Sequence, residues 1–154
     1  MGQIIESVCR FLESDHWGYE RRAGRQVLTI PFAGKSGKWT CYAQERFTQF
    51  LFYSVVPINA PEAVRAQVAE YLTRANYGLV MGNFELDFKD GEIRYKTMVD
   101  VGDGELTENL IRPVVYVNCM MMDKYFPGLM SVMFGNVSPA DAVALIENSP
   151  TASA

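Results

Sequence analysis

The sequence contains a single histidine, His16, and this limits the chemistry that its side chains could perform. A metal site built from several imidazoles is excluded, and a histidine-assisted nucleophile would depend on this one residue beside Trp17. The three cysteines, Cys9, Cys41 and Cys119, are widely spaced and form no CxxC pair, which argues against a disulfide framework or a structural zinc site. We therefore expect a surface or boundary histidine, and we expect neither a metal nor another cofactor.

Glu85 and Asp87 form a carboxylate pair that could in principle share acid–base work. The segment around them predicts a β-hairpin in which Glu85 faces Lys96. Asp87 faces Arg94 in the same register. Cations in those positions would lower the pKa of each carboxyl group, whereas a general acid needs a raised pKa. These four side chains are therefore predicted to set the register of the hairpin and not to catalyse a reaction.

Two loops have partial resemblances to ion-binding motifs. The loop at 33–38, AGKSGK, contains Gly34-Lys35-Ser36, but a P-loop needs a glycine where this chain has Thr29, and it needs a helix after the loop. A calcium loop starting at Asp100 needs Asp or Asn where Gly102 stands. We expect a hairpin loop in the first case and a plain turn in the second.

The overall charge argues against a general nucleic-acid-binding protein. The chain has a net charge of −4 and a pI near 5.0, whereas affinity for phosphate backbones comes mainly from clustered Lys and Arg. We expect no DNA partner. Binding of an anion or RNA through Arg21, Arg22 and Arg25, with Trp17 and Tyr19 nearby, remains an alternative to a solvated basic turn.

The sequence also carries no signal for export or membrane insertion. Residues 1–11 lack the basic start and long apolar run of a signal peptide, and no run of about 20 apolar residues exists to span a bilayer. Three unpaired cysteines fit a reducing compartment. We expect a soluble, cytoplasmic protein without a membrane partner.

The elements that would position these side chains follow from apolar periodicity and turn residues. With 154 residues, 49% of them hydrophobic, the chain can form one core without metal or disulfide support. We expect one domain at 1–148 and a disordered tail at 149–154. Its expected helices lie at 4–14, 59–76, 108–134 and 139–146, and its expected strands at 17–20, 27–32, 38–43 and 46–56, before a hairpin at 80–101.

Three residues give these elements specific features. Asn59 is expected to cap its helix, with Glu62 completing a capping box. Pro31 favours an edge position or a bulge for its strand because proline has no N–H. Pro127, followed by glycine, should break or kink the long helix.

The hairpin is the clearest single element. Asp90-Gly91 predicts a two-residue type I′ turn, which needs positive φ at both residues. In the resulting register the apolar residues of 84–97 share one face and the charged residues share the other. The apolar cross-strand pairs are then Phe88 with Ile93, Leu86 with Tyr95, and Phe84 with Thr97.

The long helix is the most apolar element, and between Arg112 and Asp123 it carries no charge. Projection at 100° per residue places a core face at Leu110, Val114, Val117, Asn118, Met121, Met122 and Tyr125. Tyr116, Cys119 and Met120 share the other sector with Arg112 and Asp123. These three residues, with Met130 and Met133, are the candidate partner or dimer interface, unless the C-terminal helix folds back over them.

Several motifs together resemble a known family. They are ANYG at 75–78, GNFELD at 82–87, GEIRY at 91–95, YFPGLM at 125–130 and SP at 138–139. The sequence is similar to the YbjN family of bacterial proteins as found in cyanobacteria. This resemblance implies a type III secretion chaperone-like α+β fold, in which an antiparallel β-sheet carries helices packed on one face, and it implies homodimers that hold segments of other proteins.

The resemblance supplies no catalytic residue, so we predict a non-enzymatic protein-binding, chaperone-like or regulatory domain that acts as a homodimer. Tyr116→Asp or Met120→Asp should then give a monomer with an intact fold. The partners would be a second copy and a further protein or peptide. Anion or RNA binding, and an enzyme with an unrecognised site, remain the alternatives.

Overall fold

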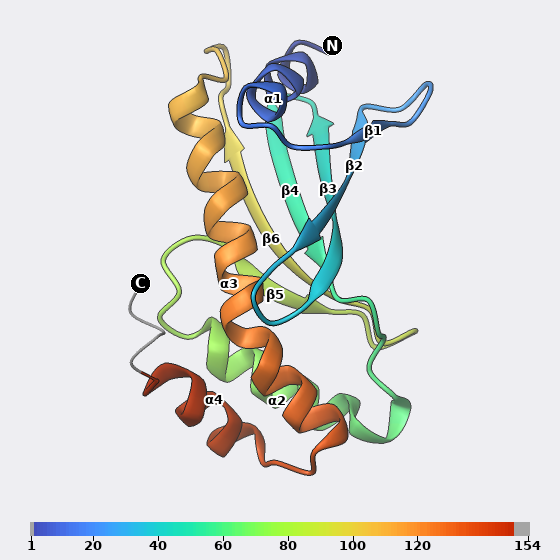
Figure 1. Cartoon of the computed structure of the whole chain (residues 1–154), viewed down its shortest axis with the longest axis vertical. Helices are drawn as coiled ribbons and strands as arrows, with labels where there is room; N and C mark the ends of the chain where they lie inside the picture. The colour runs from blue at the N-terminus through green and yellow to red at the C-terminus, as the bar shows by residue number, and fades with distance from the viewer. Residues whose placement is uncertain (1, 150–154) are drawn as a thin grey trace.

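The computed structural model describes residues 2–149, and it contains helices and one antiparallel sheet (Figure 1). The helices are α1 (Gln3–Ser14), η1 (Glu62–Val64, a 3-10 turn), α2 (Arg65–Asn76), α3 (Glu108–Phe134) and α4 (Pro139–Glu147). The strands are β1 (Glu20–Arg21), β2 (Val27–Ala33), β3 (Lys38–Arg46), β4 (Gln49–Val55), β5 (Asn83–Leu86) and β6 (Ile93–Asp100). The predicted α+β class is confirmed.

The six strands lie in the order β1-β2-β3-β4-β6-β5, and every neighbouring pair is antiparallel. Figure 1 shows α1 at one end of the sheet, α2 and α4 at the other end, and α3 running along the sheet between them. Strand β4 lies inside the sheet, as its apolar sequence predicted. The helices thus pack on one face of the sheet, which was the expected arrangement.

Alternation of side chains along each strand places one apolar face under the helices. The fully or almost fully buried residues of this face are Leu28, Ile30, Cys41, Ala43, Phe50, Phe52, Phe84, Ile93, Tyr95 and Thr97. The intervening residues face the other side, where the Arg94 guanidinium lies 4.4 Å from the centroid of the Tyr53 ring. The sheet therefore has one face in the core and one face toward solvent.

The hairpin of β5 and β6 forms, but its predicted register is wrong by two residues. Phe84 pairs with Tyr95 and not with Thr97. A type I′ turn needs positive φ at both central residues; Gly91 has a φ of 83°, but Asp90 is not in that region. The Asp90 carboxylate instead accepts the Glu92 N–H at 2.9 Å, so the chain turns through a longer loop at 87–92.

The longer loop changes which charged residues meet. Glu85 alone binds both cations, with 2.9 Å to Arg94 and 3.2 Å to Lys96. Asp87 does not face Arg94, because its carboxylate accepts a local backbone N–H from Lys89 at 2.8 Å. Phe88, expected on the buried face, is 60% exposed. The charge pairs therefore stabilise the hairpin, but in a different combination from the predicted one.

Helix α2 begins later than predicted because Asn59 has another partner. Its side-chain amide donates to the Asp90 carbonyl at 3.2 Å, and the next N–H, of Ala60, donates to the Gly91 carbonyl at 2.8 Å. Gly91 is required at this contact, since a Cβ atom there would lie 2.3 Å from the Ala60 carbonyl oxygen. The predicted capping box at Asn59 is therefore wrong.

Helix α3 is continuous over 27 residues, so the predicted break at Pro127 is wrong. Proline has no N–H and cannot donate to the Asp123 carbonyl four residues earlier. The Ser36 hydroxyl lies 2.6 Å from that carbonyl oxygen and 2.6 Å from the Asp123 Oδ1, and it can donate its one proton to either. A side chain from the loop between β2 and β3 thus offers a donor in place of the missing intrahelical one.

The backbone groups at the two edges of the sheet have different partners. At the β5 edge, the Phe84 N–H donates to the Asn76 amide oxygen at 2.7 Å, and the Asn76 amide nitrogen donates back to the Phe84 carbonyl at 3.1 Å. At the other edge, β1 pairs only with Leu28 and Thr29. Pro31 lies beyond the end of β1, which confirms its predicted edge position.

The remaining boundaries agree with the sequence in part. Helix α1 matches its prediction, whereas the strand predicted at 17–20 is reduced to the two residues of β1. The strand predicted at 46–56 begins at Gln49, because Phe47 has a φ of 56° and turns the chain. Of the predicted tail at 149–154, residues 150–154 lie outside the described residues.

Candidate functional site

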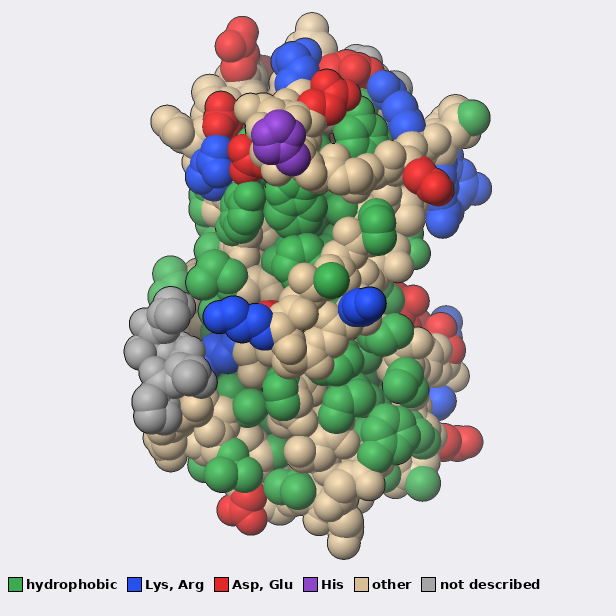
Figure 2. Space-filling model, in the orientation of Figure 1, with side chains coloured by type: hydrophobic (Ala, Val, Ile, Leu, Met, Phe, Trp, Pro, Cys, Tyr) green, Lys and Arg blue, Asp and Glu red, His purple; other side chains and the backbone are tan. Residues whose placement is uncertain are grey.

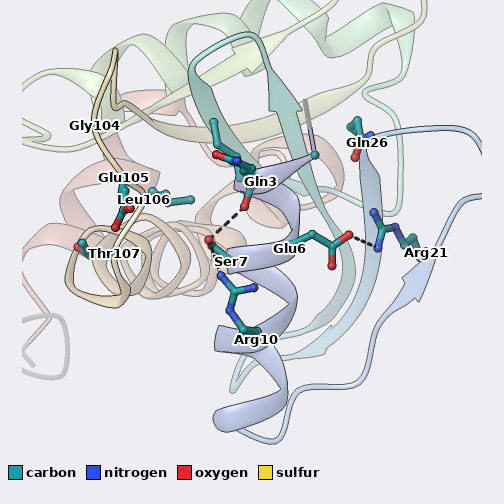
Figure 3. Close-up of a pocket in the computed structure, with 12 residues that line it drawn as sticks. Gln3, Glu6, Ser7, Arg10, Arg21, Gln26, Gly104, Glu105, Leu106 and Thr107 are labelled. Carbon is teal, nitrogen blue, oxygen red and sulfur yellow. Dashed lines mark hydrogen bonds and ion pairs between the residues drawn. The ribbon is translucent and has the colours of Figure 1, made fainter.

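A groove of about 760 Å³ runs over the N-terminal half of α1 (Figure 3). Figure 3 shows the loop at 104–107 on one side of α1 and Arg21 with Gln26 on the other. The Ser7 hydroxyl donates to the Gln3 carbonyl at 3.1 Å and accepts from Arg10 at 3.0 Å. A guanidinium cannot act as a base at neutral pH, so nothing here activates the hydroxyl as a nucleophile.

The basic residues of the predicted anion site have separate partners. Arg21 forms a 2.6 Å ion pair with Glu6, and this hydrogen bond raises the pKa of the Arg21 guanidinium. The Arg22 guanidinium lies 5.9 Å from the centroid of the Tyr42 ring. The structure therefore does not gather the arginines around one anion-sized space.

The aromatic residues of that predicted site also pack elsewhere. Trp17 stacks on Phe32 with ring centroids 5.6 Å apart. The Tyr19 hydroxyl donates to the Glu13 carboxylate at 2.6 Å. His16 is exposed at the end of α1, as predicted, and has a φ of 61°.

The loop at 33–38, which resembles part of a P-loop, binds a carboxylate of its own chain. Asp123 accepts the N–H of Lys35 at 2.9 Å and the N–H of Ser36 at 2.8 Å. Burial opposes ionisation of Asp123, but the hydrogen bonds from Ser36 and Lys35 outweigh it and lower the pKa of Asp123. The backbone donors that a phosphate could use are therefore occupied from within the molecule.

The cysteines lie in the core and form no metal site. All three are free and buried, and contact with Cys41 together with burial raises the pKa of the Cys119 thiol. Within residues 2–149, no group of three His, Cys, Asp or Glu side chains is placed to hold a metal ion. Over the same residues, no helix is both long enough and apolar enough to cross a bilayer.

The predicted interface residues do not share one surface. Cys119 and Met133 are 2% and 6% exposed and belong to the core, and Met130 is half-buried. Tyr116 is covered by Trp17, whose indole N–H donates to its hydroxyl at 3.3 Å, while that hydroxyl donates to Asp15 at 2.8 Å. Only Met120, at 47% exposed, points clearly to solvent.

The outer face of α3 carries an apolar strip that includes Met120. Leu110 is 40% exposed, and Pro113 and Val117 are half-buried. We call Leu110, Pro113, Val117 and Met120 the α3 strip. Figure 2 shows hydrophobic side chains gathered over the middle of α3, with charged side chains above them and basic side chains below.

Sequence reasoning placed Leu110 and Val117 in the core, and this is wrong for both, since neither belongs to the core cluster. The buried face of α3 is centred on Ile111, Val115 and Met122, which turns Leu110 and Val117 outward. The useful signal in the sequence was the lack of charge between Arg112 and Asp123. That run predicted an apolar outer face, although not which residues form it.

Comparisons with known proteins place this fold in a family. A sequence model of YbjN, described as "Putative bacterial sensory transduction regulator", matches residues 5–130. The structure is similar to a crystal structure of YbjN, described as "a putative transcription regulator from E. coli", with a TM-score of 0.64 and 13% identity over 88% of this chain and 93% of that chain. At this identity the likeness shows the fold alone. No sequence among curated proteins matches the chain.

The match of the YbjN model to most of the chain covers the motifs at 75–95 and 125–130, and the SP motif at 138–139 lies beyond it. The further likeness to type III secretion chaperones stays a prediction. The chain belongs to the YbjN family, whose description is that of a regulator and not of an enzyme.

Proposed function

We propose that this chain is a non-enzymatic, cytoplasmic regulatory domain that acts by binding protein, in the first place a second copy of itself. The observation that carries the proposal is the α3 strip. It places apolar side chains at the surface of a helix whose residues between Arg112 and Asp123 carry no charge. Contiguous exposed apolar surface of this kind is typical of interaction sites.

The rest of the described surface supports binding over catalysis. The Ser7 hydroxyl in the groove over α1 donates to a backbone carbonyl and not to a carboxylate, and the carboxylate of Glu85 is neutralised by Arg94 and Lys96. The regulatory description of the family is consistent with a protein that works through contacts. Burial of one exposed Leu or Met side chain contributes at most about 1.5–3 kcal/mol, so several strip residues must act together.

Light scattering after size exclusion, over a range of protein concentrations, tests this proposal. The wild type should dissociate from dimer to monomer on dilution, and Met120→Asp should raise the dissociation constant more than tenfold. Leu145→Asp is the matched control, because Leu145 is 70% exposed on α4, outside the strip. Circular dichroism should show the same helix content in all three proteins.

A wild type that stays monomeric at every concentration would overturn the proposal, as would a dimer that is lost in Leu145→Asp and kept in Met120→Asp. Tyr116→Asp is a poor test of the interface. It would remove the hydroxyl that bonds Asp15 and Trp17, and it would place a second carboxylate beside Asp15. A change in oligomeric state caused by Tyr116→Asp would therefore not be separable from a loss of folding stability.

A further inference from the structure

We infer that two copies pair through the α3 strip with their α3 helices antiparallel and with Val117 at the two-fold axis. This inference rests on the proposed homodimer and specifies its geometry. Two features of α3 point to it: the spacing of the strip and the charges at its two ends.

The spacing of the strip fits a helix-to-helix seam. Leu110, Pro113, Val117, Met120 and Lys124 follow one another at alternating intervals of three and four residues. This is the a/d pattern in which two helices pack side by side. Val117 is the central member, so an antiparallel pair about Val117 places Leu110 opposite Lys124 of the second copy.

The two ends of the seam carry opposite charge. Just before and at the start of α3, acidic residues outnumber Arg112, which is itself paired with Glu108 and with Asp15, the residue after α1. The other acidic residues there are Asp103 and Glu105. This N-terminal end of the seam is therefore negative. In an antiparallel pair it lies beside the C-terminal end of the seam in the second copy.

The far end of the seam is positive. Lys124 lies there, with its amine 5.2 Å from the centroid of the Tyr125 ring. The exposed Lys35 of the neighbouring loop lies close by, since its backbone N–H donates to Asp123. Asp123 carries one negative charge against the two positive charges of Lys35 and Lys124, so this end keeps a net positive charge. Antiparallel pairing sets positive against negative at both ends, whereas parallel pairing sets like against like.

A second copy fits this surface better than an unrelated helix because the pattern is self-complementary. Rotation about Val117 exchanges the acidic end for the basic end, as a two-fold interface requires.

Cysteine crosslinking tests the geometry directly, because the three native cysteines are buried. Under mild oxidation Val117→Cys should form a disulfide-linked dimer. Leu110→Cys alone should not, because the two copies of this residue would lie about 21 Å apart along the axis at 1.5 Å per residue. An equimolar mixture of Leu110→Cys and Lys124→Cys should give a crosslinked heterodimer. Leu145→Cys measures crosslinking by random collision.

The outcomes separate the geometry from the proposed function. Efficient crosslinking of Leu110→Cys to itself would show a parallel pair and overturn the inference. A dimer in light scattering without crosslinking of Val117→Cys above the Leu145→Cys level would overturn the inference but leave the homodimer in place. A monomeric wild type would overturn both.

Charge exchange provides a second test. Lys124→Glu and Glu105→Lys should each raise the dissociation constant several-fold at low salt, and the double variant should recover most of the wild-type affinity. The single-variant effects should shrink at high salt because screening weakens exposed charges. Additive losses in the double variant would contradict antiparallel pairing.

Discussion

The Ser36 hydroxyl lies 2.6 Å from the backbone carbonyl oxygen of Asp123, which receives no N–H from Pro127 four residues later, and 2.6 Å from the Asp123 Oδ1. This contact joins two distant parts of the chain, the loop between β2 and β3 and the middle of α3. It satisfies a carbonyl that would otherwise lack a donor, and it anchors the hairpin on the helix. The continuity of α3 therefore depends on a residue outside it.

Ser36→Ala should lower the free energy of unfolding by about 1–2 kcal/mol, because a partly buried carbonyl loses its donor. Chemical denaturation measures this loss. Ser7→Ala is the control, since that hydroxyl is exposed and bonds only within α1. Equal losses in the two variants would show that the Ser36 contact contributes nothing beyond an ordinary surface hydroxyl.

Asp123→Asn should change how stability depends on pH. Hydrogen bonds from Ser36 and Lys35 hold the pKa of Asp123 below its usual 3.8 despite the opposing effect of burial. A carboxyl group whose pKa is lower in the folded state than in the unfolded state stabilises the fold fully at pH values above its unfolded-state pKa. This stabilisation is lost as the pH falls through the folded-state pKa. The stability advantage of the wild type over Asp123→Asn should therefore be constant near neutral pH and disappear below pH 3.8.

Thermal unfolding of both proteins from neutral pH down to acid pH measures this difference. Glu70→Gln, at an exposed ion pair on α2, controls for the general effect of removing a carboxylate. A constant difference between wild type and Asp123→Asn at every pH would contradict the ionised contact.

Gly128→Ala should separate α2 from α3. A Cβ atom at this position would lie 2.3 Å from the Tyr71 hydroxyl oxygen, which donates to the Tyr125 carbonyl at 2.6 Å. Overpacking of this kind costs about 1–3 kcal/mol. Tyr71→Phe removes the atom that clashes, so Gly128→Ala should cost less in the Tyr71→Phe background than in the wild type. A double-mutant cycle by denaturation that gives additive losses would contradict this account.

The sequence was sufficient for the parts of the fold that depend on local pattern. Alternating apolar residues in the strands, and the three-to-four spacing in α1, predicted the sheet, the helices and the α+β class. The errors lie where a distant residue decides the local structure. Asn59 looks like a helix cap but bonds Asp90, and Pro127 looks like a helix break but is compensated by Ser36.

The candidate surface was predictable only in part, for a geometric reason. A nearly all-apolar helix gives little contrast between its faces, so the projection of α3 misplaced Leu110 and Cys119. Met120 was assigned to the outer side correctly. The cover over Tyr116 could not be predicted, because Trp17 reaches it from a segment about 100 positions away, and no local pattern records that contact.

The side chain of Asn76 imitates one residue of a neighbouring strand, since it accepts from the Phe84 N–H and donates to the Phe84 carbonyl. An unprotected β5 edge would offer these two groups to any extended chain and would allow the sheets of many molecules to join end to end. With Asn76 in place, the Phe84 N–H and carbonyl are already bonded within the molecule and are not free to pair with an extended chain.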